Sequence, residues 1–117
     1  MKKITILLGA VLALACGNAA LAADVAAGEA KAKQLCASCH AVGGDWTKTL
    51  QPDYPRLAGQ HADYLVTALT AYKQGDKSLI GRKNAIMGAQ AAALSEQDIQ
   101  NLAAYLSKQT GTLSIKR

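Results

Sequence analysis

The sequence contains no phenylalanine, one tryptophan and four tyrosines, so it has few large side chains with which to fill a hydrophobic core. Much of its apolar content is alanine, which buries little area per residue. A domain of this length also lies near the lower limit at which a hydrophobic core suffices alone, because small chains bury a smaller share of their surface. We therefore expect a bound group to supply part of the core.

No apolar run in the sequence is long enough to span a membrane. The N-terminal run, residues 4–15, is about twelve residues long, whereas a transmembrane helix needs about 20. This run follows Lys2 and Lys3 and precedes the small-residue sequence Ala20-Leu21-Ala22, an arrangement typical of a secretory signal peptide. The sequence predicts a cleaved signal over residues 1–22 and a single exported domain over residues 23–117.

A lipid anchor is the minor alternative for this N-terminal segment. The sequence Ala13-Leu14-Ala15-Cys16 loosely resembles the site at which bacterial lipoproteins are cut and lipidated on cysteine, although Ala13 stands where leucine is usual. A second cleavage site follows at residues 20–22. We therefore expect Cys16 to be removed with the signal.

The sequence lacks a run of charges of one sign. Residues 23–117 carry eleven Lys and Arg against eight Asp and Glu, a net charge of +3, and the basic residues are scattered singly or in pairs. This distribution does not favour nucleic-acid binding. The basic residues that could steer an acidic partner, most of them expected simply to be solvated, are Lys31, Lys33, Lys48, Lys73, Lys77, Arg82 and Lys83.

The periodicity predicts an all-α fold, with no convincing strand. Residues 25–40 are mostly strong helix formers that follow an N-cap residue, Asp24. Residues 61–74 carry apolar side chains at helical spacing and end at Gly75, which fits a C-terminal stop. These two segments are predicted to be helices.

A third helix is predicted over residues 96–108. Ser95 provides the N-cap, and acidic residues follow it in the first turn. One apolar stripe is formed by Ile99, Leu102, Ala103 and Leu106. Between the helices, glycines and prolines predict two loops, residues 41–59 and residues 76–94, of which the first is expected to wrap a functional site.

The sequence Cys36-Ala37-Ser38-Cys39-His40 is the attachment motif of a c-type haem. On a helical turn, residues i, i+3 and i+4 share one face. Cys36 and Cys39 can therefore form thioethers with the two haem vinyl groups while His40 binds the iron. The motif predicts one covalently bound haem c.

Three other interpretations of the two cysteines are weaker. A structural zinc site needs four ligands, and the only other histidine or cysteine after the signal is His61. A thioredoxin-like pair requires a strand before the motif, and no strand is predicted. A disulfide is the default in an exported protein, but a bridge that closes so short a loop stabilises little.

The second iron ligand determines what the haem does. Met87 is the only methionine outside the signal, and a His/Met pair fills both axial positions, which suits electron transfer. His61 is the rival ligand, although a hydrogen-bonded or exposed histidine is the preferred interpretation there. The metal ligands predicted are therefore His40 and Met87.

The chain resembles the small bacterial class I c-type cytochromes, and especially one half of the two-haem periplasmic cytochromes. The stretches that carry the resemblance are the haem motif, Tyr54-Pro55-Arg56-Leu57-Ala58-Gly59-Gln60, His61-Ala62-Asp63-Tyr64-Leu65, the Met87 loop and Leu94-Ser95-Glu96-Gln97-Asp98-Ile99. The resemblance implies three to five helices wrapped around one haem, with Gly28 and Tyr105 near the crossing of the terminal helices.

The resemblance also implies roles for residues near the haem. The carbonyl of Pro55 would orient His40, and Arg56 and Trp46 would contact the haem propionates. The function implied is that of a periplasmic one-electron carrier, not an enzyme, which docks transiently as a monomer on an oxidase, reductase or dehydrogenase. A haem-based sensor, or the haem subunit of a larger oxidoreductase, is the alternative.

Overall fold

The computed structural model describes residues 22–112, and helices are the regular secondary structure of this range. The helices are α1 (Val25–Leu35), α2 (Ala37–His40), α3 (Ala62–Gln74), α4 (Ala85–Ala92) and α5 (Glu96–Leu106), and the 3₁₀ turns are η1 (Val42–Gly44) and η2 (Gly75–Lys77). No strand occurs among the described residues, so the prediction of an all-α fold is confirmed. Cys16 and residues 1–21 of the predicted signal peptide lie outside the described range.

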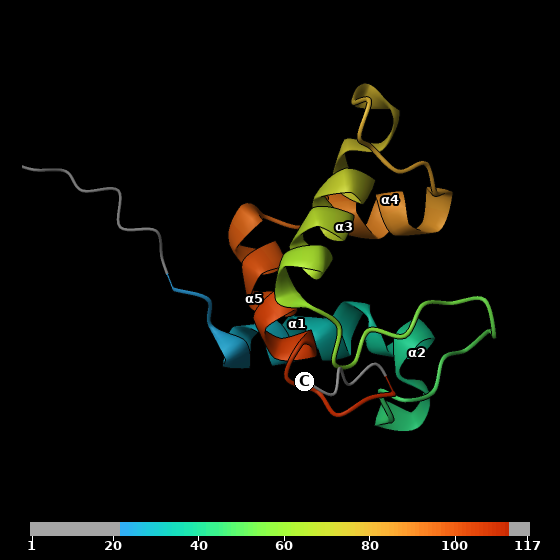
Figure 1. The fold of residues 1–117 in the computed structure, drawn as a ribbon, viewed down its shortest axis with the longest axis vertical. Helices are drawn as coiled ribbons and strands as arrows, with labels where there is room; N and C mark the ends of the chain where they lie inside the picture. Colours follow the sequence, from blue (N-terminus) through green and yellow to red (C-terminus); the bar gives the residue numbers. More distant parts are fainter. Residues whose placement is uncertain (1–21, 113–117) are drawn as a thin grey trace, which may run out of the picture.

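The first and last helices cross, as Figure 1 shows. Gly28 of α1 lies against the backbone of α5: a Cβ atom at this position would come 2.0 Å from the carbonyl oxygen of Asn101 and 3.1 Å from the Cβ of Tyr105. Only glycine permits this approach of the two backbones. Gly28 and Tyr105 therefore lie at the helix crossing, as the resemblance implied.

The apolar stripe of α5 forms the centre of the core. Ile99, Leu102, Ala103 and Leu106 are each at most 2 % exposed. The helix begins with a capping box, in which the Ser95 hydroxyl accepts the Asp98 amide N–H at 3.0 Å and the Asp98 carboxylate accepts the Ser95 N–H at 2.9 Å. The predicted start and buried face of this helix are confirmed, and its end, predicted near residue 108, is observed at Leu106.

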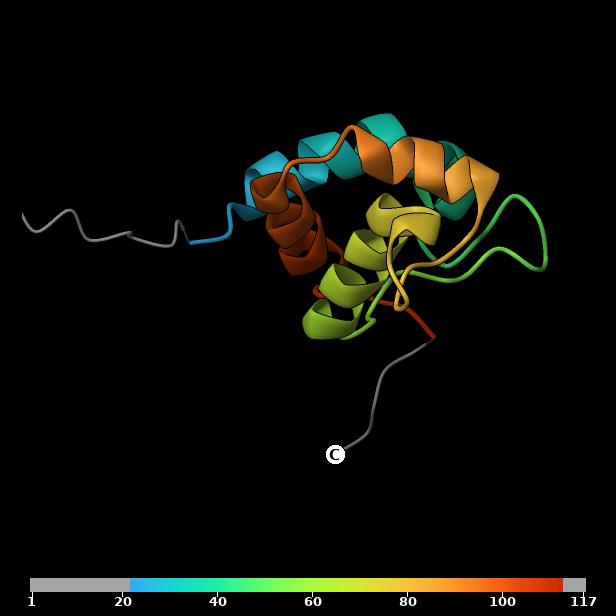
Figure 2. The same ribbon diagram turned by 90° about the horizontal axis from the view of Figure 1, so that it is seen from above.

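Helix α3 is the element that connects the two sides of the molecule. It packs against α5 on one side and against α4 on the other, and Figure 2 shows α3 between these two helices. Its C-terminal stop is the predicted one, since Gly75 has a positive φ of 56° that a residue with a side chain rarely adopts. Helices α3 and α4 both border the space next to the cysteine motif.

The segment predicted as one helix over residues 25–40 is two helices. Helix α1 ends at Leu35, Cys36 forms a turn, and α2 covers Ala37–His40. The Cys36 amide still donates to the carbonyl of Ala32 at 2.9 Å, so the break is a tight local turn. Helix propensity alone does not reveal such a turn, because strong helix formers flank it and neither glycine nor proline marks the break.

The prediction of a loop over residues 76–94 is wrong in its second half, where α4 covers Ala85–Ala92. Asn84 caps this helix by accepting the Met87 N–H at 2.8 Å. Half of the eight residues of α4 are alanine, the strongest helix former. The short alanine-rich sequence has no sustained apolar stripe, and Gly88 interrupts it, so the periodicity gave no signal for it.

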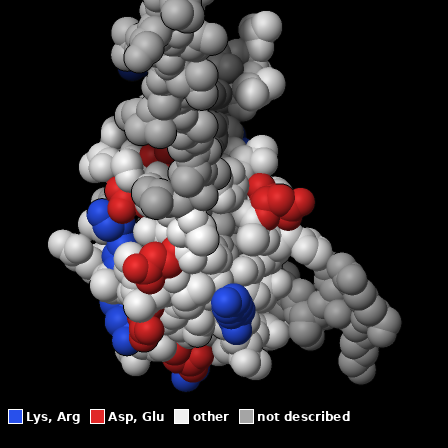
Figure 3. Space-filling view, turned by 90° about the vertical axis from the view of Figure 1, so that its left-hand side faces the viewer, with Lys and Arg blue, Asp and Glu red and all other residues white. Residues whose placement is uncertain are grey.

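The surface carries charges of both signs in close proximity. On the face shown in Figure 3, acidic and basic side chains are intermingled. Ion pairs include Lys31 with Asp98 at 3.0 Å, which joins α1 to α5, and Lys33 with Glu29 at 2.6 Å within α1. Among residues 22–112, no helix has the length and apolar character required to cross a membrane.

Candidate haem site

A cavity of about 370 Å³ lies between the cysteine motif, α3 and α4. Residues 53–57 close one side of it, and Leu102 and Leu106 of α5 form part of its inner wall. Its volume is in the range of sites that hold small ligands and cofactors, which is about 300–1,000 Å³. The leucines that give the cavity its apolar character are Leu35, Leu57, Leu65, Leu69 and Leu94.

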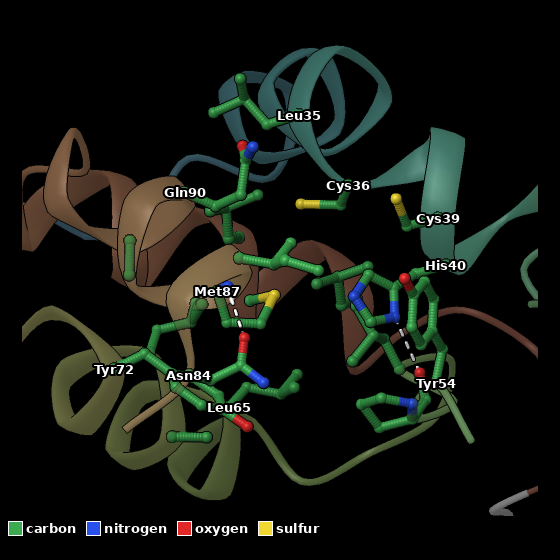
Figure 4. Close-up of a pocket in the computed structure, with 18 of the residues that line it drawn as sticks. Leu35, Cys36, Cys39, His40, Tyr54, Leu65, Tyr72, Asn84, Met87 and Gln90 are labelled. Carbon is green, nitrogen blue, oxygen red and sulfur yellow. Dashed lines mark hydrogen bonds between the residues drawn. The ribbon is translucent and has the colours of Figure 1, made fainter. Parts of the chain in front are cut away.

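The cysteine motif forms one wall of this cavity. Cys36 and Cys39 both line it and are half-buried, and Figure 4 shows their sulfur atoms on the same side of the space. The carbonyl of Cys36 accepts the His40 N–H at 2.9 Å, so the motif is wound into a helical turn. This turn places the three side chains that the sequence singled out next to one another.

Burial also affects the chemistry of the first thiol. Withdrawal from water, and next the neighbouring Cys39, raise the pKa of Cys36 from 9.0 to about 11. The unmodified thiol of the folded chain would therefore stay protonated at neutral pH, and a protonated thiol is a poor nucleophile. This half-buried position suits a sulfur atom in a neutral thioether better than a reactive thiolate.

His40 is 5 % exposed and is held by one hydrogen bond from its ring. Its Nδ1 lies 2.8 Å from the carbonyl oxygen of Pro55. A carbonyl can only accept a hydrogen bond, so Nδ1 carries the proton and Nε2 keeps a free lone pair. The imidazole is thus held in the tautomer that a metal ligand requires.

Met87 lies on the opposite wall. It is half-buried, lines the cavity from the first turn of α4, and faces His40 across the space in Figure 4. The structure thus brings the sequence's two predicted metal ligands to a single cavity, although Met87 belongs to a helix and not to a loop. His61, the rival ligand, is exposed at the N-cap of α3 and is not among the residues that line this cavity.

The two residues predicted to contact propionates are placed differently from each other. Arg56 is exposed at the cavity rim, and its Nη1 donates to the Thr112 hydroxyl at 2.9 Å. Trp46 is 8 % exposed and packs edge-on against Tyr105, with ring centroids 5.9 Å apart. Trp46 does not line the cavity, so packing in the core is the role that the structure gives it.

The cavity also contains Arg82 and Asn84, which the sequence did not assign to the haem site. The guanidinium of Arg82 lies 5.6 Å from the ring centroid of Tyr64 and 5.4 Å from that of Tyr72, and all three residues line the cavity. Asn84 lines it too. Asn84 gave a signal that could have been used, because asparagine three residues before Met87 fits an N-cap.

The donor set of the cavity fits a covalently attached haem. Two thiols three residues apart in the sequence, an imidazole nitrogen and a thioether sulfur surround one largely apolar space. Among the described residues, no group of three or more His, Cys, Asp or Glu side chains could hold a bare metal ion. The arrangement suits an iron porphyrin with two axial ligands better than zinc.

Comparisons with known proteins agree with this chemistry. The family model described as Cytochrome c matches residues 25–110. Cytochrome c-554(548) of Halomonas halodenitrificans is 42 % identical over 88 residues, which are 75 % of this chain and 99 % of that protein. Cytochrome c4 of Stutzerimonas stutzeri is 35 % identical over 117 residues, which are 97 % of this chain but 53 % of that protein.

A solved structure supports the same assignment. The reduced recombinant cytochrome c4 of Pseudomonas stutzeri superimposes with a TM-score of 0.66 at 36 % sequence identity, over 78 % of this chain and 48 % of that one. The chain therefore spans about half the length of its cytochrome c4 relatives and nearly the whole of cytochrome c-554(548). A match over most of the described residues shows that the chain belongs to the cytochrome c family, whose members carry covalently bound haem c.

Proposed function

We propose that the protein is a one-electron carrier in which Cys36 and Cys39 attach one haem c and His40 and Met87 are the axial iron ligands. The observation that carries the proposal is the position of His40 and Met87 on facing walls of one cavity (Figure 4). A haem iron with both axial positions filled by protein has no open position for a substrate, which suits electron transfer. The protein is accordingly a carrier and not an enzyme.

The haem, when bound, supplies an iron that alternates between the ferrous and ferric states. The protein's own residues control its surroundings. The Pro55 carbonyl holds the proton on His40 Nδ1, which strengthens the imidazole as a ligand. The leucines of the cavity exclude water, and solvent access is one of the factors that set a redox potential. Arg56 lies at the exposed rim, where its guanidinium would contact a propionate.

The proposal includes a cellular setting, which the sequence and the family support. Residues 1–22 are a signal peptide, and residues 23–117 are one haem domain that works in the periplasm as a monomer. Its partners are redox proteins that dock briefly near the haem edge, as transient redox interfaces are among the smallest known. The near balance of charge in residues 23–117, eleven Lys and Arg against eight Asp and Glu, supports brief docking better than a strong one-sign attraction.

An intact-mass measurement of the exported protein, together with its visible spectrum, tests the attachment. We expect the mass of residues 23–117 plus one haem, with the haem retained in denaturant because it is covalently bound. Replacement of Cys36 and Cys39 by alanine should release it. A mature protein without the mass of a haem would overturn the proposal.

A second measurement distinguishes a carrier from a sensor. The ferric protein should show the near-infrared charge-transfer band of a methionine sulfur bound to iron, and the ferrous protein should not bind carbon monoxide promptly. Prompt carbon monoxide binding would identify an open or easily opened position and favour a haem-based sensor. A partner that copurifies in a fixed ratio through salt washes would favour a subunit of a larger oxidoreductase.

A further inference from the structure

Asn84 closes the first turn of the helix that carries Met87. Its backbone is extended (φ −156°, ψ 119°), its side chain accepts the Met87 N–H at 2.8 Å, and its carbonyl accepts the Gly88 N–H at 2.8 Å. Figure 4 shows the side-chain bond beside the Met87 sulfur. Asn84 is therefore the residue whose side chain fixes the backbone of Met87 directly.

Little else holds this turn in place. Helix α4 has eight residues, and helices this short are not stable by themselves. Asn84, Ala85 and Ile86 are all exposed, and Ile86 retains 58 % of its accessible surface. The described residues that pack most closely on α4 belong to α3 alone. The cap thus restrains a first turn whose other side chains are largely exposed.

The chain just before the cap is anchored to α3. The Arg82 N–H donates to the Ala71 carbonyl at 2.9 Å, and the Arg82 guanidinium lies over the rings of Tyr64 and Tyr72. Residue 82 is therefore fixed in space, and Asn84 follows it two residues later. The cap transmits this fixed position to the backbone of Met87.

We propose that Asn84 is a positioning residue, whose N-cap bond keeps the Met87 thioether directed at the iron and so limits how often an external ligand can take its place. This inference rests on the proposed ligation by Met87. The N-cap bond is made only when the first turn is formed. Loss of the bond therefore raises the population in which Met87 has left the iron, and an external ligand binds in proportion to that population.

The test compares Asn84→Ala and Asn84→Ser in the full-length ferric haem protein, titrated with imidazole. Alanine removes the cap acceptor, whereas serine keeps one. We expect Asn84→Ala to bind imidazole about two- to thirty-fold more tightly than the wild type, since a lost cap shifts an equilibrium by this factor. Asn84→Ser should bind imidazole with nearly the wild-type affinity, and both variants should keep the near-infrared band without imidazole.

Ser95→Ala is the matched control, because it removes the cap of α5 instead. It should lower the melting temperature as much as Asn84→Ala does and leave the imidazole affinity unchanged. The inference is wrong if Asn84→Ala binds imidazole with the wild-type affinity. It is also wrong if Asn84→Ala and Asn84→Ser gain the same imidazole affinity. In either case the electron-carrier proposal stands. Absence of the near-infrared band from the wild type would instead overturn the ligation by Met87 and the inference with it.

Discussion

Gly28 of α1 lies in direct contact with the backbone of Asn101 in α5, so closely that a Cβ atom at residue 28 would be 2.0 Å from the Asn101 carbonyl oxygen. The side chain of the same asparagine, 8 % exposed, accepts the Asp24 N–H at 2.8 Å just before α1 begins. Asn101 therefore fixes both the position and the start of α1. Since α1 leads directly into the cysteine motif, this contact determines where the motif lies relative to α5.

Gly28→Ala is expected to destabilise the protein. The added methyl group forces the two helices apart, and overpacking of this kind costs about 1–3 kcal/mol. A difference of about 1 kcal/mol shifts the melting temperature of a domain of this size by roughly 4–8 °C. Thermal unfolding followed by circular dichroism measures the shift. Alanine is the better helix former, so an unchanged or higher melting temperature would show that the helices do not approach this closely.

The stability contributed by Asp98 should depend on pH. The Ser95 backbone N–H, and next the ammonium of Lys31, hold the pKa of Asp98 below its usual 3.8. A carboxylate with a lowered pKa in the folded state stabilises the fold above its unfolded pKa, and this contribution is lost as the pH falls through the folded pKa. Asp98→Asn should therefore lower the free energy of unfolding at pH 7 by about 1 kcal/mol, and the difference should shrink below about pH 4.

Urea unfolding at pH 7 and pH 3 measures both values, and Glu96→Gln provides the control. Glu96 lies in the same first turn but is exposed and outside the capping box. Its replacement removes the same charge from the helix dipole and should have the smaller effect, about 0.3–1 kcal/mol at most. An equal loss in both variants at pH 7 would mean that the dipole, and not the Ser95–Asp98–Lys31 contacts, accounts for the stability.

Arg56→Gln should lower the reduction potential of the haem. A positive charge at the cavity rim favours the ferrous state, which carries one positive charge fewer than the ferric state, so its removal favours the ferric state. We expect a shift on the order of tens of millivolts, given that about 59 mV corresponds to a tenfold change in a one-electron equilibrium. Spectroelectrochemical titration measures the potential.

Lys33→Gln is the control for Arg56→Gln. It removes the same charge from a residue of α1 that is exposed and does not line the cavity. Its potential should stay within a few millivolts of the wild type, since charges at a distance are screened by salt. If the two variants shift the potential equally, net charge and not the position of Arg56 is responsible.

The features that the sequence predicted well are those determined by neighbouring residues. Helix α5 has its cap at Ser95 and a continuous apolar stripe, and the structure places both as predicted. The turn of the cysteine motif is equally local, because the hydrogen bonds that wind it join residues three and four apart. Such interactions leave a pattern that can be read from the sequence itself.

The features that the residue pattern alone did not predict depend on contacts between distant segments. Helix α4 is stabilised by its cap and by packing on α3, neither of which gives the residues a helical period. The core position of Trp46 depends on Tyr105, 59 residues later in the chain. The bond between Pro55 and His40 was expected only from the family resemblance, because no rule of spacing relates a carbonyl to a ring fifteen residues away.

Replacement of the two rival axial ligands decides between them. Met87→Ala should abolish the near-infrared sulfur-to-iron band and lower the reduction potential, by on the order of a hundred millivolts, because methionine ligation raises the potential of a haem and axial ligands span about 0.8 V. His61→Ala should change neither, since His61 is exposed at the start of α3 and does not line the cavity. Circular dichroism should show that both variants retain their helices. A wild-type protein without the band, whose potential changes on His61→Ala but not on Met87→Ala, would assign the second position to His61 and require α3 to move from the position described.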